Sequence, residues 1–362
     1  GRRFVACGDF HTVLIQSDGH ASAFGSNVYG QCEVPQLPNG FCYISAAAGC
    51  RHTVLLRSDG EAVVFGANEH GQCNVPPRRK GVQYVAADAG SWHTVLLGSD
   101  GRVFAFGRHV EGQCNIPDLA IEKPTHAVTL SGREAGVRPS IKQQAIHYLA
   151  VAAGAFHTVL LRSDGVVSFT KSSRLIPRLP LGVACVDVAA CLEQTLLLCS
   201  NGQVFAFGPD GGDLHPLKPS AGMKYTAMAT GPHHVLLLQS DGQVVAHGPD
   251  HGRCAVPPLP AFSRYTDVAA GLRHSVALRS DGVAVAFGDS TSQESTPSIF
   301  RVRAGPCDVP KGLKCGDGAE TAGMKVQPLT SLRPATSDEG LTIQKSRERS
   351  SQRTVFVLGD DL

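Results

Sequence analysis

Short runs of apolar residues recur in pairs along the chain, and each pair is joined by a tight polar turn. In one copy, Thr53-Val54-Leu55-Leu56 is followed by Ser58-Asp59-Gly60 and then by Ala62-Val63-Val64-Phe65. Asp-Gly between two such runs is a strong hairpin signal, because glycine accepts a positive φ without a Cβ clash. The pattern predicts antiparallel strand pairs, and no segment shows a convincing helical period.

Seven turns of this kind divide the chain into repeats. The turn glycines, which are 41, 41, 64, 37, 40 and 40 residues apart, are Gly19, Gly60, Gly101, Gly165, Gly202, Gly242 and Gly282. Repeats of this length are typical of propellers, solenoids and arrays. An Ala-rich run before each hairpin, such as residues 84–87, predicts an inner strand. The Gly-Gln-Cys-x-Val-Pro segment after the hairpin predicts an outer edge strand, where proline is tolerated.

Each predicted sheet has two apolar faces, which it can bury only against neighbouring sheets. A closed ring buries both faces of every sheet, whereas an open stack exposes both ends. The chain is therefore expected to be all-β, a seven-bladed β-propeller with three to four antiparallel strands in each blade. We assign residues 1–310 to the propeller, with insertions at 118–147 and 289–304. Residues 311–353 are expected to form a polar disordered segment, and residues 354–362 a strand that closes blade one.

The repeated phrase is similar to that of the regulator of chromosome condensation family, in its compact-repeat form. Its parts are Ala-Gly-x-x-His-Thr, Ser-Asp-Gly, Phe-Gly and Gly-Gln-Cys-x-Val-Pro, and they extend over all seven units. The resemblance implies a propeller of seven blades. Units four to six depart from the phrase, for example with Cys191 in the glycine position and Gln194 in the histidine position. These blades are expected to be irregular.

One histidine recurs at the start of the hairpin in six of the units: His11, His52, His93, His157, His234 and His274. A residue repeated in every blade serves the blade, whereas catalysis needs one asymmetric constellation. We therefore expect these histidines to hydrogen-bond backbone groups, as structural residues of the repeat together with the turn glycines. Since no nucleophile elbow, Cys-x-x-Cys pair or dinucleotide-binding motif is present, we expect no enzymatic activity, no cofactor and no metal.

Composition limits the partners. The chain has 33 Lys and Arg against 31 Asp and Glu, a net charge of +2, so no global field attracts nucleic acid or anionic lipid. No apolar stretch approaches the roughly 18 residues of a membrane span. Twelve cysteines are scattered through the chain, and five recur at one position of the repeat, which favours a reducing compartment over a disulfide framework. We expect an intracellular monomer, cytoplasmic or nuclear, with a protein partner.

The favoured function is a non-enzymatic protein-interaction scaffold that binds through loops on the propeller faces. The basic residues of the two insertions are the candidate partner-binding residues: Arg133, Arg138, Lys142, Arg301 and Arg303. The resemblance implies two alternatives. One is a guanine-nucleotide exchange factor for a small GTPase, and the other is the substrate-recruiting propeller region of a HECT-type ubiquitin ligase, with a ubiquitination substrate as partner.

Overall fold

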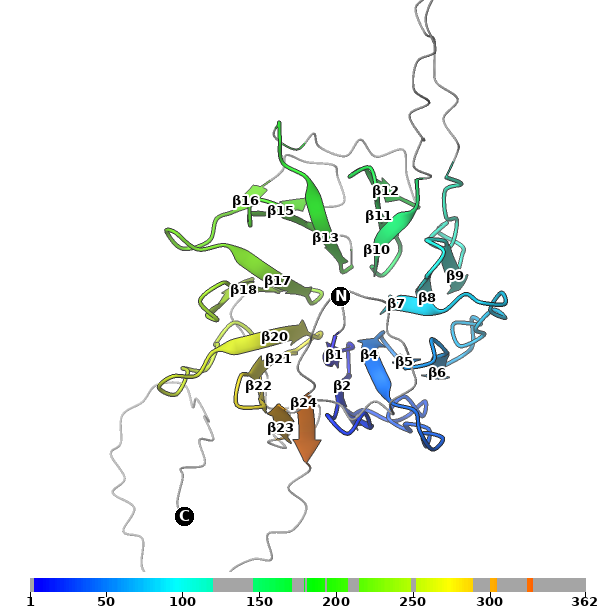
Figure 1. Ribbon diagram of the computed structural model, residues 1–362, viewed down its shortest axis with the longest axis horizontal. Coiled ribbons are helices and arrows are strands. Elements are labelled where there is room, and N and C mark those ends of the chain that lie inside the picture. The colour runs from blue at the N-terminus through cyan, green and yellow to red at the C-terminus, as the bar shows by residue number, and fades with distance from the viewer. Residues whose placement is uncertain are drawn as a thin grey trace, which may run out of the picture.

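The computed structural model describes residues 3–119, 146–170, 179, 181–192, 194–207, 215–248, 252–288, 300–304 and 324–327. These residues form seven antiparallel sheets, arranged radially around a central axis (Figure 1). No helix occurs among them. The predicted seven-bladed all-β propeller is confirmed.

The strands follow the order of the chain, and each blade runs from an inner to an outer strand. Blades one to three contain β1 (Val5–Cys7), β2 (His11–Ile15), β3 (Ala21–Gly25); β4 (Tyr43–Ala48), β5 (His52–Arg57), β6 (Ala62–Gly66); and β7 (Tyr84–Ala89), β8 (His93–Gly98), β9 (Val103–Gly107). Blades four and five contain β10 (Tyr148–Ala153), β11 (Thr158–Arg162), β12 (Val167–Phe169); and β13 (Cys185–Ala190), β14 (Thr195–Cys199), β15 (Val204–Phe207), β16 (His215–Leu217). Blades six and seven contain β17 (Tyr225–Thr230), β18 (Val235–Gln239), β19 (Val244–His247); and β20 (Tyr265–Ala270), β21 (His274–Arg279), β22 (Val283–Gly288), β23 (Phe300–Ala304), β24 (Met324–Gln327).

The Gly-Gln-Cys-x-Val-Pro segment was wrongly expected to be an outer strand. In blades one to three it forms a turn followed by an extended stretch without ladder partners, for example at residues 30–36. Its proline has no N–H to donate, and the residues before it are held by turn hydrogen bonds such as Glu33 N to Gly30 O at 3.0 Å.

Seven hydrophobic cores lie between the blades, one in each seam. Successive residues of a middle strand point in opposite directions, so Leu55 of β5 packs against blade one and Leu56 packs against blade three. Both leucines are almost completely buried. Each sheet therefore hides both faces against its two neighbours, which is the physical reason for a closed ring.

Blade seven meets blade one and completes the ring. Val5 and Leu14 share a core with Leu278, and the backbone N–H of Phe4 donates to Asp267 Oδ2 at 3.3 Å. The closing strand predicted at 354–362 lies outside the described residues. Of the segment 311–353, only residues 324–327 are described, and they form β24 beside β23.

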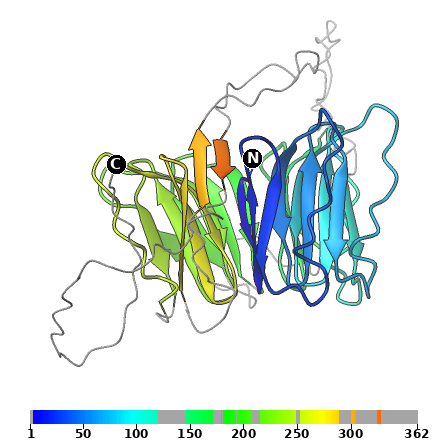
Figure 2. The same cartoon turned by 90° about the horizontal axis from the view of Figure 1, so that it is seen from below.

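The ring has two faces, visible in side view in Figure 2. The turn face, uppermost in that view, carries the Asp-Gly turns and the loops that lead into each inner strand. The histidine face carries the loops that follow the inner and the third strands. An alanine-lined pocket runs along the axis, with wall residues from the inner strands of all seven blades. The small side chains of the Ala-rich runs thus allow close approach at the centre, as expected.

Candidate functional site

The recurrent histidines form a belt of hydrogen bonds between blades. Each one contacts the Thr or Ser hydroxyl that follows the histidine position of the next blade. The six contacts are His11–Thr53 at 2.8 Å, His52–Thr94 at 3.0 Å, His93–Thr158 at 2.9 Å, His157–Thr195 at 3.2 Å, His234–Ser275 at 2.7 Å and His274–Thr12 at 2.8 Å, each from Nε2. The partner is a side-chain hydroxyl and not the backbone group that the sequence suggested.

The direction of these hydrogen bonds follows from the hydroxyl's second partner. Thr53 Oγ1 donates its only proton to the Gln31 carbonyl at 2.7 Å, so it must accept from His11 Nε2. Thr94 donates in the same way to the Gln72 carbonyl at 2.7 Å. The histidine, the hydroxyl and the Gly-Gln-Cys loop therefore clamp adjacent blades together.

Burial keeps the imidazoles of this belt neutral. Desolvation lowers the pKa of His11, His52 and His93 to about 3, and that of His234 and His274 to about 4. The Nδ1 atoms of these five rings are buried without a hydrogen-bond partner, so a second proton would be an unpaired buried charge. Such rings cannot exchange protons with a substrate near neutral pH, which supports a structural role.

The belt has a gap between blades five and six. Gln194 replaces the donating histidine and is exposed, and Val235 replaces the hydroxyl that it would reach. Cys191 replaces the glycine that elsewhere lies against the imidazole; a Cβ on Gly49, for example, would lie 2.4 Å from the His52 ring. Three departures from the repeat thus have one cause, the missing imidazole.

The turn glycines contact the next blade on the turn face. The carbonyl of Gly60 accepts from Tyr84 N at 2.9 Å, and a Cβ on Gly60 would lie 2.4 Å from Gln83 Cβ. Gly165 has the same conformation, with φ +81° against +79° at Gly60, but nothing lies within 4 Å of its Cβ position.

This difference gives a matched pair of substitutions. Gly165→Val is expected to destabilise the fold by about 1–2 kcal/mol through the positive φ alone. Gly60→Val adds a collision with blade three and should cost about 1–3 kcal/mol more. Urea denaturation of both variants measures the difference, and equal losses would show that the Gly60 turn does not pack against blade three.

The repeated cysteines are thiols that close the loop on the histidine face. Cys32 Sγ donates to the Ser26 carbonyl at 3.3 Å and Cys73 Sγ to the Ala67 carbonyl at 3.2 Å. Burial raises the pKa of both thiols to about 11, so neither is a nucleophile at neutral pH. No disulfide joins any two of the described cysteines.

The candidate partner-binding residues lie in the two insertions. Arg133, Arg138 and Lys142 lie outside the described residues. Arg301 and Arg303 lie in β23, where their backbones pair with β22 and β24. Part of the insertion at 289–304 is therefore a strand of blade seven, and not a loop throughout as expected.

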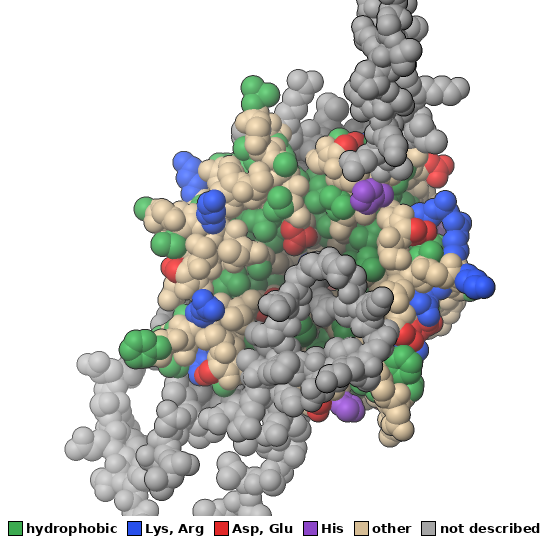
Figure 3. Space-filling view, viewed as in Figure 1, with side chains coloured by type: hydrophobic (Ala, Val, Ile, Leu, Met, Phe, Trp, Pro, Cys, Tyr) green, Lys and Arg blue, Asp and Glu red, His purple; other side chains and the backbone are tan. Residues whose placement is uncertain are grey.

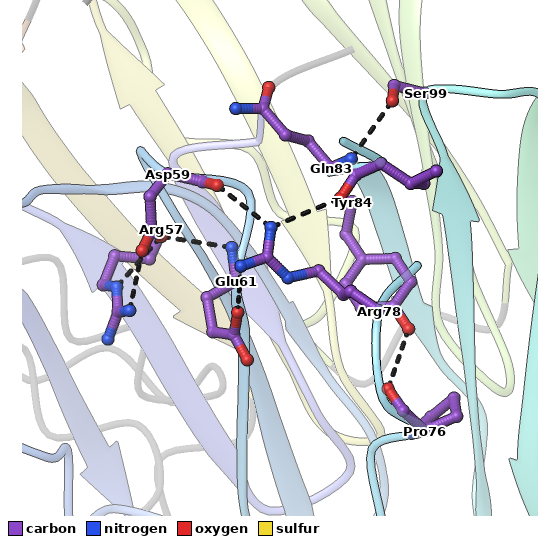
Figure 4. Close-up of polar contacts among 9 residues, drawn as sticks. Arg57, Asp59, Glu61, Pro76, Arg78, Gln83, Tyr84 and Ser99 are labelled. Carbon is purple, nitrogen blue, oxygen red and sulfur yellow. Dashed lines mark hydrogen bonds and ion pairs between the residues drawn. The ribbon is translucent and has the colours of Figure 1, made fainter. Parts of the chain in front are cut away.

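The first residue of the basic run at residues 78–80 is held by contacts within the protein. Arg78 forms an ion pair with Glu61 at 2.5 Å and donates to the carbonyls of Asp59 and Val82 (Figure 4). Asp59 in turn forms an ion pair with Arg57 at 2.7 Å. The charged side chains of Arg57, Asp59, Glu61 and Arg78 are thus paired with one another. Seen from the turn face, Lys and Arg side chains gather near the rim, whereas hydrophobic side chains lie both at the rim and nearer the axis (Figure 3).

The histidine face carries a cluster that sequence reasoning missed. We define the aromatic–arginine cluster as Tyr29, Arg51, His70 and Trp92. The Arg51 guanidinium lies 4.7 Å from the centre of the Tyr29 ring and 5.0 Å from that of Trp92, and it donates to the Tyr29 hydroxyl at 2.6 Å. His70 meets Trp92 edge-on at 5.5 Å. Three blades thus assemble one rigid cluster.

Two exposed valines lie in loops of the histidine face. Val28 precedes Tyr29 and is 82% exposed, and Val110 occupies the equivalent position in blade three at 78%. The available signal was variation: the residue before the recurrent histidine is Phe10, Arg51 and Trp92 in blades one to three, whereas the Gly and His around it repeat. The described residues place no group of three or more His, Cys, Asp or Glu side chains where it could hold a metal ion. The described residues contain no helix, and so no helix among them could span a membrane.

Ring closure, radial sheets and the interblade belt define a β-propeller. Residues 3–31, 43–72, 84–113 and 265–293 match the regulator of chromosome condensation (RCC1) repeat. Blades one, two, three and seven are therefore repeats of that family, and the resemblance seen in the sequence is confirmed. The unmatched blades are four to six, where the phrase departs from its consensus. A search of curated proteins found no significant match.

Several solved structures are similar to this chain. The CRINKLY WD40 ectodomain of the Arabidopsis thaliana receptor kinase ACR4 is 18% identical, with a TM-score of 0.56 over 80% of this chain and 96% of that chain. Human WBSCR16 is 20% identical, with a TM-score of 0.47 over 80% and 77%. Saccharomyces cerevisiae Prp20p is 18% identical, with a TM-score of 0.44 over 80% and 72%.

Proposed function

We propose that this chain is a non-enzymatic protein-interaction platform whose partner binds the histidine face. The observation that carries the proposal is the aromatic–arginine cluster. Trp, Tyr and Arg are the residue types that dominate binding energy at protein interfaces, and here they are assembled before any partner arrives. Because Arg51 is held between two rings, little side-chain entropy remains to be lost on binding.

The belt of neutral histidines supports the same function. It places no titratable group at the surface for chemistry, but it ties neighbouring blades and so holds the loops of the histidine face in register. A rigid ring with variable loops is a common arrangement for recognition. An exchange factor for a small GTPase remains the alternative, since RCC1 repeats are present. The ubiquitin-ligase role and an intracellular location remain predictions.

Truncating the cluster tests the proposal. Trp92→Ala is expected to weaken partner binding by about tenfold to 100-fold, which corresponds to the loss at a central interface anchor. Immobilised full-length protein captures partners from a cell extract, and quantitative mass spectrometry compares the variant with wild type. The same proteins are then measured by titration as purified components.

The matched control is Arg273→Ala. Arg273 occupies in blade seven the position that Arg51 occupies in blade two, and it is exposed without a described aromatic neighbour. Binding should survive this change. If Trp92→Ala and Arg273→Ala bind alike, the cluster is not the interface. Accelerated release of fluorescent GDP from any small GTPase would instead favour the exchange factor.

A further inference from the structure

A proline-rich loop leads from blade six into β20 on the turn face. It contains Val256-Pro257-Pro258-Leu259-Pro260-Ala261-Phe262-Ser263. Phe262 is fully exposed, at 107% of the reference area, and has φ +63°. It is the one residue other than glycine with a positive φ in the described part of the chain. A bulky residue in that conformation is a genuine outlier.

Other blades show what this turn requires. Ser263 N donates to the Pro260 carbonyl at 3.1 Å, which closes a four-residue turn with Phe262 at its third position. Four equivalent turns have glycine there, with φ between +79° and +86°: Gly40, Gly81, Gly182 and Gly222. Nothing lies within 4 Å of a Cβ built on any of them. The positive φ, and not a lack of space, is therefore the reason for glycine.

Among the described residues, none compensates for phenylalanine at this position. Its ring is exposed and packs on no core, so it adds backbone strain and an apolar surface without stabilising the blade. Blade one offers the contrast. There the turn has Gly40, and the neighbouring Phe41 is covered by the Arg57 guanidinium at 4.8 Å from its ring centre. Phe262 is thus kept in a strained, uncovered position that folding alone does not favour.

The residues before Phe262 are rigid; some of them pack on the core, and the others are exposed to solvent. Val256 and Leu259 pack against the core between blades six and seven, and Tyr265 Oη donates to the Pro257 carbonyl at 2.9 Å. Pro258 and Pro260 are exposed on the other side. Because proline holds φ near −65°, this exposed strip is ordered before binding. Figure 1 shows the loop before β20 projecting from the edge of the ring.

We propose that the exposed strip of Pro258, Pro260 and Phe262 is a second docking site, for a partner domain whose groove is lined by aromatic side chains and accepts proline-rich segments. Pyrrolidine rings fit between aromatic rings, and a segment that prolines and a closed turn hold in place before binding loses little entropy. Phe262 supplies a large apolar anchor beside the prolines. This site is on the face opposite the aromatic–arginine cluster and does not depend on it.

The test uses the full-length chain and a panel of purified SH3 and WW domains as probes. Fluorescence anisotropy of each labelled domain measures binding to wild type and to Phe262→Gly. We expect at least one domain to bind wild type, and Phe262→Gly to weaken that binding at least tenfold. The same substitution should leave the thermal midpoint unchanged or raise it, because it restores the residue used in four other blades. Trp92→Ala should bind these domains like wild type.

The matched control is Leu181→Ala. Leu181 is also fully exposed, at 104%, and lies beside Gly182 in the equivalent turn of blade five. Its loss should not change binding. The proposal is overturned if no domain binds wild type, if Phe262→Gly binds equally well, if Leu181→Ala weakens binding as much, or if Phe262→Gly lowers the thermal midpoint.

Discussion

Lowering the pH from 7 to 5.5 is expected to remove on the order of 5 kcal/mol from the free energy of unfolding. Five belt histidines have a pKa of about 3 to 4 in the folded protein, against about 6.5 in an unfolded chain. Between these values the unfolded state binds more protons, so each imidazole favours unfolding as the pH falls through 6.5. A typical domain has only about 5–15 kcal/mol of stability, so unfolding should begin well above the usual carboxylate range.

The axial carboxyl group of Asp267 acts in the opposite direction. Burial raises its pKa to about 6, so the folded state binds the extra proton and gains stability as the pH falls. Burial likewise raises the pKa of Asp88. These groups offset only part of the contribution of five histidines. Urea denaturation at pH 7.5, 6.5 and 5.5 measures the balance, and a midpoint that stays constant over this range would contradict the neutral buried belt.

Removing a single belt histidine is expected to cost about 3–5 kcal/mol. His93→Ala leaves the Thr158 hydroxyl without its donor and opens a cavity between blades three and four, and both effects destabilise a packed seam. Thermal and urea denaturation of the variant give the loss directly. The seam between blades three and four should open before the other seams. Amide hydrogen exchange in β8 and β11 would detect this opening.

The control for this experiment is His20→Ala. His20 lies in the turn of blade one with its side chain 64% exposed, and its removal should change stability by less than about 0.5 kcal/mol. Similar losses in the two variants would mean that the interblade hydrogen bond contributes nothing beyond a solvated histidine.

The two docking sites differ in how far the sequence could predict them. Phe262 is recognisable once the turns are aligned, because glycine stands at that position in four other blades. The aromatic–arginine cluster is not, since Tyr29, Arg51 and Trp92 are separated by 22 and 41 residues in the sequence. They meet because loops of consecutive blades lie side by side on the histidine face.

Local pattern was sufficient for the inner strand and the hairpin of each blade, for the turns and for the number of blades. Asp-Gly turns and alternating apolar residues act over a few positions, and the repeat makes the same short-range preference visible seven times. Closure also followed, because two apolar faces on every sheet leave no other arrangement that buries them all.

The tertiary structure alone decided which groups bind one another across the seams. The sequence predicted structural histidines but not their hydroxyl partners. From blade one to blade five, each partner belongs to the next blade and lies 38 to 65 residues further along the chain. It also could not show that Cys191, Gln194 and Val235 share one cause, since their link passes through an imidazole that is missing. Hydrogen bonds and steric contacts act through space, so distant residues become dependent on each other only when the ring brings their blades together.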